Sequence, residues 1–497
     1  MLDQTQTPLL DQLKHSARRS HSAFYAPGHK GGQGISQSLR DLLGIQVFQA
    51  DLPELPELDN LFAPTGVIQQ AQALAAEAFG AEQTWFLTNG STAGVIGAIL
   101  ATCGFADDPG HGQKIIVPRN AHQSVISGLV LSGAIAIFVT PDYDPDWDLV
   151  GPVSPESIAQ ALEVHPDARA VLIVSPTYQG ICSDVGAIGQ IVHQYNIPLL
   201  VDEAHGPHFG FHPDLPDSAL SWGADLVVQS THKVLGAMTQ AAMVHVQGDR
   251  INRQSLSRAL QLVQSTSPSY LLLASLDAAR QQMATQGKVL LARTLQLAGQ
   301  AQAQLQAIAG IEPFQLAFPA GRDGHIQLDP TRLTVRVTDL GLRGYEADEI
   351  LHQHLGVTAE LPNLKHLTFI LSLGNTVQDI ENLVQGFRHL AQRHCPGNAV
   401  DKFPAPSVAR EIFQTIESII PRTAFFARTV MRGADQAVGC VSSEWVCPYP
   451  PGIPSLLPGE RITLEAIDYL RQVLAWGGVI TGCSDPSLQT LRVLADP

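Results

Sequence analysis

The sequence predicts an α/β protein whose larger domain is built on a mainly parallel sheet with helices on both faces. Short apolar runs of strand length recur along the first half of the chain, and helical patterns separate them. The runs are almost continuously apolar, as is typical of strands that are buried on both faces. Right-handed crossovers between such strands would bring their carboxyl ends to one edge of the sheet.

The predicted elements follow one another in a regular order. The expected strands of the large domain are residues 84–87, 114–117, 135–139, 170–174, 198–201 and 225–228. A stretch rich in Ala, Gln and Leu, residues 271–312, predicts a long helix. The strand-like runs 333–337 and 367–373 flank a helical pattern at 345–355, which indicates a smaller α+β domain. Another helix is expected from about Thr463.

The length of 497 residues favours two or three domains. We expect an N-terminal arm (1–25), a large domain (26–312), a small α+β domain (313–395) and a C-terminal domain (396–497). Apolar residues make up 45% of the chain and charged residues 15%, which suits extensive buried surface and excludes a disordered protein.

Composition also excludes several classes of partner. The net charge of −16 argues against nucleic acid, whose backbone requires basic patches. The six cysteines form neither a CxxC pair nor a Cys/His cluster, so no disulfide framework and no metal site are expected. Without an apolar leader in the first thirty residues, a reducing, cytoplasmic location is expected. The uncharged stretches 90–106 and 124–140 are shorter than the roughly 18–20 residues of a membrane span, so buried helix and strand are expected there.

Polar and reactive side chains follow most of the predicted strands, where open α/β sheets bind ligands. They are Gly90, Ser91 and Thr92 after the first run, His122 after the second, Tyr178 after the fourth, Asp202 with Ala204 and His205 after the fifth, and Ser230, His232 and Lys233 after the sixth. Taken singly, each has an ordinary explanation, such as a helix cap or a solvated lysine.

As an ordered set, these residues predict a site for pyridoxal 5′-phosphate (PLP). Asp202 ends an apolar strand, and a carboxylate there needs a cation such as a protonated pyridine nitrogen. Lys233 at the same edge would be partly desolvated and therefore nucleophilic. The hydroxyls of Ser91 and Thr92, beside Gly90, could bind an anion at a helix N-terminus, and His122 could stack on the ring.

Six segments spread along the chain also form recognisable motifs. They are 26–32 (APGHKGG), 51–61, 201–206 (VDEAHG), 230–233 (STHK), 266–270 (TSPSY), and Glu444 with 446–454 (VCPYPPGIP). In these motifs the chain resembles the fold-type-I ornithine/lysine/arginine decarboxylases of bacteria. The resemblance implies a seven-stranded large-domain sheet and a cofactor bound by Lys233 as a Schiff base.

The resemblance also implies roles for individual residues. Asp202 would pair with the pyridinium nitrogen, His122 would stack on the ring, and Ser91, Thr92 and Ser230 would hold the phosphate. Gly90, Ala204 and His205 complete the implied cofactor set, with Ser267 and Ser269 acting across the interface of a homodimer or larger oligomer whose subunits share active sites. Glu444, His29 and Tyr178 form the implied substrate-binding set.

Two departures from the family pattern stand out. The first motif opens only 26 residues into the chain, so it resembles the short form without a receiver-like N-terminal domain. Gln123 stands where the family's Asn-x-His-Lys pattern has lysine, which puts a local phosphate or interface contact in doubt.

The expected reaction is decarboxylation of a basic L-amino acid in polyamine metabolism, with Lys233 or His232 returning a proton to Cα. Arginine, giving agmatine, is placed slightly ahead of lysine (to cadaverine) and ornithine (to putrescine). One alternative is an aminotransferase or β-eliminating lyase on the same scaffold, because a fold does not fix a reaction. The other is a non-catalytic, PLP-binding regulatory subunit.

Overall fold

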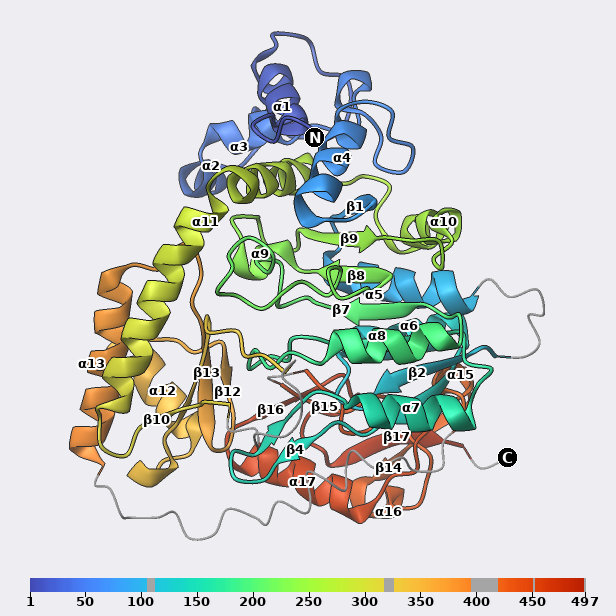
Figure 1. Ribbon diagram of the computed structural model, residues 1–497, viewed down its shortest axis with the longest axis vertical. Coiled ribbons are helices and arrows are strands. Elements are labelled where there is room, and N and C mark those ends of the chain that lie inside the picture. Colours follow the sequence, from blue (N-terminus) through green and yellow to red (C-terminus); the bar gives the residue numbers. More distant parts are fainter. Residues whose placement is uncertain (105–111, 317–325, 395–418, 450–451, 496–497) are drawn as a thin grey trace.

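The computed structural model describes residues 1–104, 112–316, 326–394, 419–449 and 452–495. Its centre is a seven-stranded sheet with the strand order β1-β9-β8-β7-β6-β2-β3 (Figure 1). The strands are β1 (Gln83–Leu87), β2 (Lys114–Pro118), β3 (Ile135–Val139), β6 (Ala170–Val174), β7 (Leu199–Asp202), β8 (Leu226–Gln229) and β9 (Ala242–Val246). From β3 to β8 the neighbours are parallel, whereas β9 is antiparallel to both β8 and β1. The predicted α/β class and mainly parallel sheet are confirmed.

Helices cover both faces of this sheet because successive strand residues point to opposite sides. On one face, Ile115 and Val117 pack with α5 (Gly90–Ile99), α6 (Gln123–Ser132) and α10 (Arg253–Val263). On the other, Ile116 packs with α7 (Pro155–Val164) and α8 (Val185–Gln194). These three residues of β2 are fully buried, which explains why both faces of this strand are apolar.

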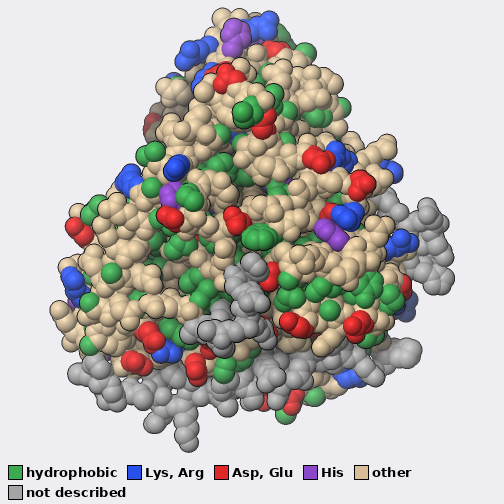
Figure 2. Space-filling view, in the orientation of Figure 1, with side chains coloured by type: hydrophobic (Ala, Val, Ile, Leu, Met, Phe, Trp, Pro, Cys, Tyr) green, Lys and Arg blue, Asp and Glu red, His purple; other side chains and the backbone are tan. Residues whose placement is uncertain are grey.

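The described residues of the two uncharged stretches fold as elements of the large domain, in which the helices are mainly buried and the strand at 135–139 is mostly half-buried. The first forms α5 and a π-helical turn (Leu100–Gly104), and the second forms α6 followed by β3. No helix within the described part of the chain is long and apolar enough to cross a membrane. Acidic and basic side chains are interspersed over the face that Figure 2 shows.

A second, antiparallel sheet lies beside the large domain. It contains β10 (Glu312–Pro313), β11 (Arg332–Arg336), β13 (His366–Ile370) and β12 (Leu361–Pro362), in that order. Helices α12 (Gly344–Leu355) and α13 (Val377–Arg393) pack on it. The 37-residue helix α11 (Tyr270–Gln306) runs from the N-terminal region to this sheet (Figure 1).

The C-terminal part packs below the large sheet in Figure 1. Its described residues form β14 (Thr429–Gly433) paired with β17 (Thr490–Leu494), β15 (Cys447–Tyr449) paired with β16 (Val479–Thr481), and the helices α15 (Pro421–Phe426), α16 (Ala434–Ala437) and α17 (Leu464–Ala475). The hydroxyl of Thr463 caps α17, as the sequence predicts. The expected domain boundary at 395/396 lies outside the described residues.

The N-terminal region comprises α1 (Pro8–Arg18), α2 (Gln37–Leu43), α3 (Ile45–Ala50) and α4 (Val67–Phe79). A buried ion pair on α11 fixes α1. Asp277 Oδ2 accepts the backbone N–H groups of Leu9 (3.0 Å) and Leu10 (3.3 Å) at the start of α1. Arg280 pairs with Asp277 and donates to the carbonyl oxygens of Gln4 and Gln6. The carboxylate also suits the positive end of the helix dipole.

We expect Asp277→Ala to destabilise the protein by about 3–5 kcal/mol, because it leaves the Arg280 charge buried without its partner. Urea unfolding followed by circular dichroism measures this effect. Asp11→Ala, which removes the exposed partner of Lys14, is the control and should shift the midpoint far less. Equal shifts for the two variants would contradict the interpretation.

Candidate active site

The predicted reactive residues meet at the carboxyl edge of the large sheet. Lys233 lies on the short helix α9 (Thr231–Val234) that follows β8. Its Nζ is 2.9 Å from His205 Nε2 and 5.7 Å from the centre of the Tyr178 ring. The rings of Tyr178 and His205 are 4.6 Å apart. Residues from the ends of three neighbouring strands, β6, β7 and β8, therefore surround one amine.

Asp202, which is buried, and Lys233, which is half-buried, influence each other electrostatically. Parallel pairing sets Asp202, the last residue of β7, beside Val228 of β8. Asp202 is 6% exposed, and its Oδ1 accepts the Ala204 N–H at 3.2 Å. Burial raises the pKa of Asp202, while Lys233 opposes that rise. Burial lowers the pKa of Lys233 to about 8, although Asp202 acts in the other direction. The amine is therefore much closer to its free base than an ordinary lysine.

Three histidines surround this pair. Burial and the nearby Lys233 charge lower the pKa of His122 to about 4, and burial together with Lys233 lowers the pKa of His205 well below its ordinary value. Both imidazoles are therefore neutral at pH 7. His232 has its pKa lowered by burial, and its Nδ1 lies 3.0 Å from the Ala241 carbonyl oxygen, so Nδ1 carries the proton. Gln123 follows His122 directly and opens α6.

Hydroxyl groups gather at the N-terminus of α5. Ser230 Oγ donates to Ser91 Oγ at 2.7 Å, which joins the end of β8 to the start of the helix. Gly90 has a φ of +73°, a conformation that favours glycine, and its N–H donates to the Gln240 carbonyl oxygen. Thr92 is exposed in the first turn. Such a helix start, with adjacent hydroxyls, suits a phosphate group.

These features fit PLP. Asp202 is a buried carboxylate that could hold a ring-nitrogen proton, Lys233 is an amine suited to attack an aldehyde, and the start of α5 suits a phosphate. His205 Nδ1 is buried and has no hydrogen-bond partner among the described residues, so a polar group is missing beside it.

For four predicted residues the structure shows contacts with groups other than Lys233 or Asp202, or only their exposure. His29 contacts Asp51 (Nε2 to Oδ2, 3.1 Å) in the N-terminal region. Ser267 is exposed and Ser269 half-buried, both just before α11. Both carboxylate oxygens of Glu444 are engaged within the C-terminal part: they accept the N–H and hydroxyl of Ser484 and the N–H of Arg492. The binding roles of these four residues remain predictions.

Two charged residues of the site were not predicted. Arg332, at the start of β11, donates from Nη2 to the His205 carbonyl oxygen at 3.0 Å. It is buried; its Nε forms an ion pair with Asp329 Oδ2 at 3.7 Å, and its Nη1 has no hydrogen-bond partner in the part that the structure describes. Glu360 precedes β12, and its charge raises the pKa of Lys233 against the larger effect of burial. Both come from the smaller sheet, and no local motif marks their approach to Lys233.

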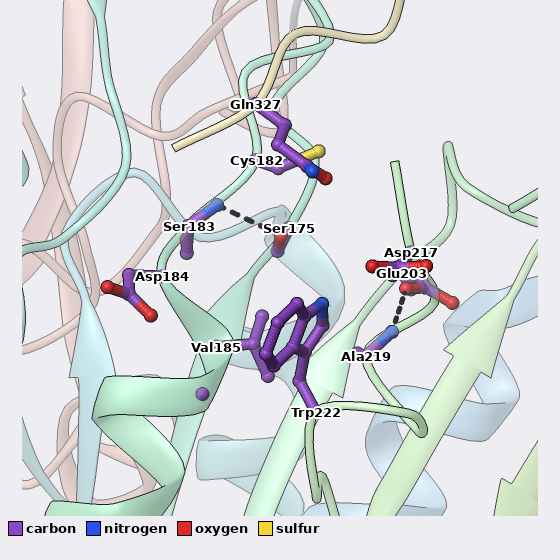
Figure 3. A pocket seen from close by; sticks show the side chains of 11 residues that line it. Ser175, Cys182, Ser183, Asp184, Val185, Glu203, Asp217, Ala219, Trp222 and Gln327 are labelled. Atoms are coloured by element: carbon purple, nitrogen blue, oxygen red, sulfur yellow. Dashed lines mark hydrogen bonds between the residues drawn. The ribbon is translucent and has the colours of Figure 1, made fainter. Parts of the chain in front are cut away.

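A hydrogen-bond network behind the site fixes the strand ends. Glu203, next to Asp202, accepts from Gln229 Nε2 at 2.6 Å and from the Ala219 N–H at 2.7 Å. Burial raises the pKa of Glu203 to about 7. Its side chain lines a small pocket with Ser175, Ser183, Trp222 and others (Figure 3). Because Gln229 immediately precedes Ser230, the network aligns the ends of β7 and β8.

Comparisons with protein families and with individual proteins both identify the Orn/Lys/Arg decarboxylases as relatives of this chain. The profile of the Orn/Lys/Arg decarboxylase major domain matches residues 7–379, and that of the C-terminal domain of the same enzymes matches residues 427–484. The chain is 37% identical to an arginine decarboxylase of Bacillus anthracis, with 100% of this chain and 98% of the relative covered. It is 25% identical to lysine decarboxylase LdcA of Pseudomonas aeruginosa, with 92% of this chain and 74% of the relative covered.

Solved structures show the same fold. Lysine decarboxylase A from Pseudomonas aeruginosa aligns with a TM-score of 0.85 at 21% identity, covering 99% of this chain and 81% of that one. The Francisella novicida lysine decarboxylase LdcF aligns with a TM-score of 0.83, also at 21% identity, covering 99% and 81%.

Proposed function

Because the chain belongs to the Orn/Lys/Arg decarboxylase family, we propose that it converts L-arginine to agmatine and CO2. The chain is a PLP-dependent decarboxylase of basic amino acids. The choice of arginine rests on one observation: relatives named arginine decarboxylase are 37–38% identical over the whole chain, whereas those named lysine decarboxylase are 23–25% identical.

The described residues would hold PLP at three points. Lys233 would bond to its aldehyde carbon, Asp202 would hold the proton on its ring nitrogen, and Ser91 with Ser230 would bind its phosphate. The neutral His122 would cover the ring face. Bound PLP supplies an electron sink for the pair left on Cα when CO2 departs.

Lys233 is our proposed proton donor to Cα. An amine whose pKa is about 8 can both release and regain a proton near neutral pH. His205 Nε2, at 2.9 Å, orients this amine as a neutral acceptor. His232 is the second candidate. Its Nδ1 proton is donated to the Ala241 carbonyl oxygen, so only Nε2 could exchange a proton with the substrate.

Arg332 is our proposed partner for the substrate carboxylate. Its guanidinium is buried and acts electrostatically on Lys233; Nε is ion-paired with Asp329 Oδ2 (3.7 Å), and Nη1 has no hydrogen-bond partner among the described residues. A carboxylate could accept a charge-assisted N–H bond from Nη1, which would orient the bond to be broken. Tyr178, which is half-buried beside His205, would line the substrate pocket next to Arg332.

Glu360 is our first choice to bind the distal guanidinium, ahead of Glu444, because the oxygens of Glu444 are already engaged. We expect Glu360→Gln to raise the KM for arginine about tenfold, since a charge-assisted hydrogen bond is lost. Steady-state kinetics measure this change. Glu444→Gln is the matched control: it should lower thermal stability and leave KM nearly unchanged. The opposite pattern would return the role to Glu444.

We also propose a homodimer or larger oligomer, in which Ser267 and Ser269 contact the cofactor of a second protomer. The exposure of Ser267 on the surface before α11 supports this arrangement. Light scattering with and without PLP would give the oligomeric state.

The test of the function is an assay with arginine, lysine and ornithine in parallel, with PLP added. We expect CO2 and agmatine from arginine at the highest kcat/KM. Keto acid in place of amine would favour an aminotransferase. A bound-cofactor absorbance band without turnover of any of the three substrates would favour a regulatory subunit.

A further inference from the structure

Arg119 connects the cofactor domain to the C-terminal part through a buried set of hydrogen bonds. It follows β2 and lies three residues before His122, and it is 2% exposed. Its Nη1 donates to the Pro454 carbonyl oxygen (2.7 Å), and its Nη2 donates to the Ser455 carbonyl oxygen (3.0 Å) and to Glu460 Oε2 (3.0 Å). We call Arg119 and Glu460 the Arg119 clamp.

The carbonyl groups that the clamp holds belong to a segment that closes on itself. Ser455 N–H donates to the Val446 carbonyl oxygen at 2.8 Å, and Val446 N–H donates to the Leu456 carbonyl oxygen at 3.0 Å. Val446 is therefore joined to Ser455 and Leu456, and the clamp fixes this junction to the large domain.

The far end of this segment reaches the candidate active site. A Cβ atom placed on Gly452 would lie 3.8 Å from His122 Cδ2 and 3.7 Å from the Tyr449 ring. Burial raises the pKa of Tyr178, and Asp202 and Tyr449 add to that rise. Gly452 thus lies against His122, the residue proposed to cover the cofactor ring, and Tyr449 lies near enough to Tyr178 to affect its pKa.

Stability alone does not explain an arginine at this position. A buried ion pair is often no more stabilising than apolar residues of similar volume, because desolvation offsets the attraction. What a guanidinium adds is a rigid fork of N–H groups that fixes several acceptors at once. Here the acceptors include the backbone carbonyls of Pro454 and Ser455, in the segment near His122, so the clamp specifies a position.

We propose that Arg119 is a positioning residue for catalysis, which acts by holding the described residues 446–449 and 452–456 so that Gly452 lies against His122 and lines the substrate pocket. This inference rests on the proposed decarboxylase function and extends it to a residue outside the cofactor motifs.

The test is Arg119→Met in the PLP-loaded protein. We expect the KM for the substrate to rise about tenfold or more, because small displacements of positioning groups have large kinetic effects. The cofactor absorbance band should persist, since Lys233 and Asp202 belong to the large sheet. Hydrogen–deuterium exchange should increase in residues 446–456.

Arg280→Met is the matched control, because it breaks another fully buried Arg–carboxylate pair, one that holds the N-terminal region through the Gln4 and Gln6 carbonyls. It should lower thermal stability and leave both KM and exchange in 446–456 unchanged. An unchanged KM in Arg119→Met, an equal KM rise in the control, or loss of the cofactor band would overturn the proposal.

If Arg119→Met does not fold, Glu460→Gln replaces it. This variant keeps the two carbonyl bonds, so the KM and exchange effects should be smaller and in the same direction; no effect on either would overturn the proposal. If the wild type turns over no basic amino acid, the proposed function fails, while the exchange of residues 446–456 still decides whether the clamp holds the segment.

Discussion

Replacing Lys233 by alanine is expected to reduce decarboxylation by on the order of 10⁴-fold or more, the scale seen when a covalent catalytic group is removed. The variant loses the amine proposed both to bond the cofactor and to return a proton to Cα. Its protein-bound cofactor absorbance should disappear as well. Turnover with arginine and a spectrum after dialysis measure the two losses.

The pH dependence of cofactor reloading tests the same residue without turnover. Only the free base attacks an aldehyde, and the pKa of Lys233 is lowered from 10.5 to about 8 by burial. The rate of reloading should therefore rise with pH and level off above about pH 8, whereas an ordinary lysine would continue to accelerate toward 10.5. Lys114→Ala, at an outward-facing pair with Asp167, should leave reloading and turnover unchanged. A variant of Lys233 that still turned over arginine would contradict the assignment.

Asp202→Asn should lower kcat by about 10²–10³-fold, comparable to removing one preorganised electrostatic group. The amide has nearly the same shape but carries no charge to hold a proton on the ring nitrogen, so the electron sink weakens. Because Lys233 remains, the cofactor should stay bound. Stopped-flow or steady-state kcat, together with the cofactor spectrum, measures this separation.

Asp225→Asn provides the control for Asp202. Asp225 is also buried and directly precedes β8, but its carboxylate bonds to His193, Arg250 and the Leu199 N–H. This variant should lose stability and keep its kcat. Similar losses of kcat in the two variants would mean that a buried charge is needed only for folding.

Much of the fold could be predicted from local pattern. The six expected strands of the large sheet are present, because continuous apolar runs bounded by polar residues leave few alternatives. β9 was missed: Ala242–Val246 carries His245, which interrupts the apolar run. That histidine is buried by bonding to Thr84 on β1 and Gln229 on β8, contacts that exist only once the sheet has formed.

The residues of the candidate site likewise fall into those that local sequence predicts and those that depend on long-range packing. Asp202, His205 and Lys233 could be located because Asp202 ends β7, His205 follows it closely and Lys233 follows β8, and neighbouring parallel strands end together. Arg332 and Glu360 could not, since their approach to Lys233 depends on how the smaller sheet docks. The role of Arg119 is equally long-range, because its acceptors lie more than 330 residues further along the chain.

Helix α11 has a consequence for how the pocket works. At about 1.5 Å per residue, its 37 residues form a rod of about 55 Å, and its two halves belong to different hydrophobic cores. The smaller sheet, whose strands β11 and β12 begin at or next to Arg332 and Glu360, packs on the C-terminal end of this helix. The N-terminal end of the helix is fixed by its packing against α1 and α4. A domain held in this way has little freedom to rotate relative to the large sheet. We therefore infer that Arg332 and Glu360 already lie near Lys233 before the substrate binds.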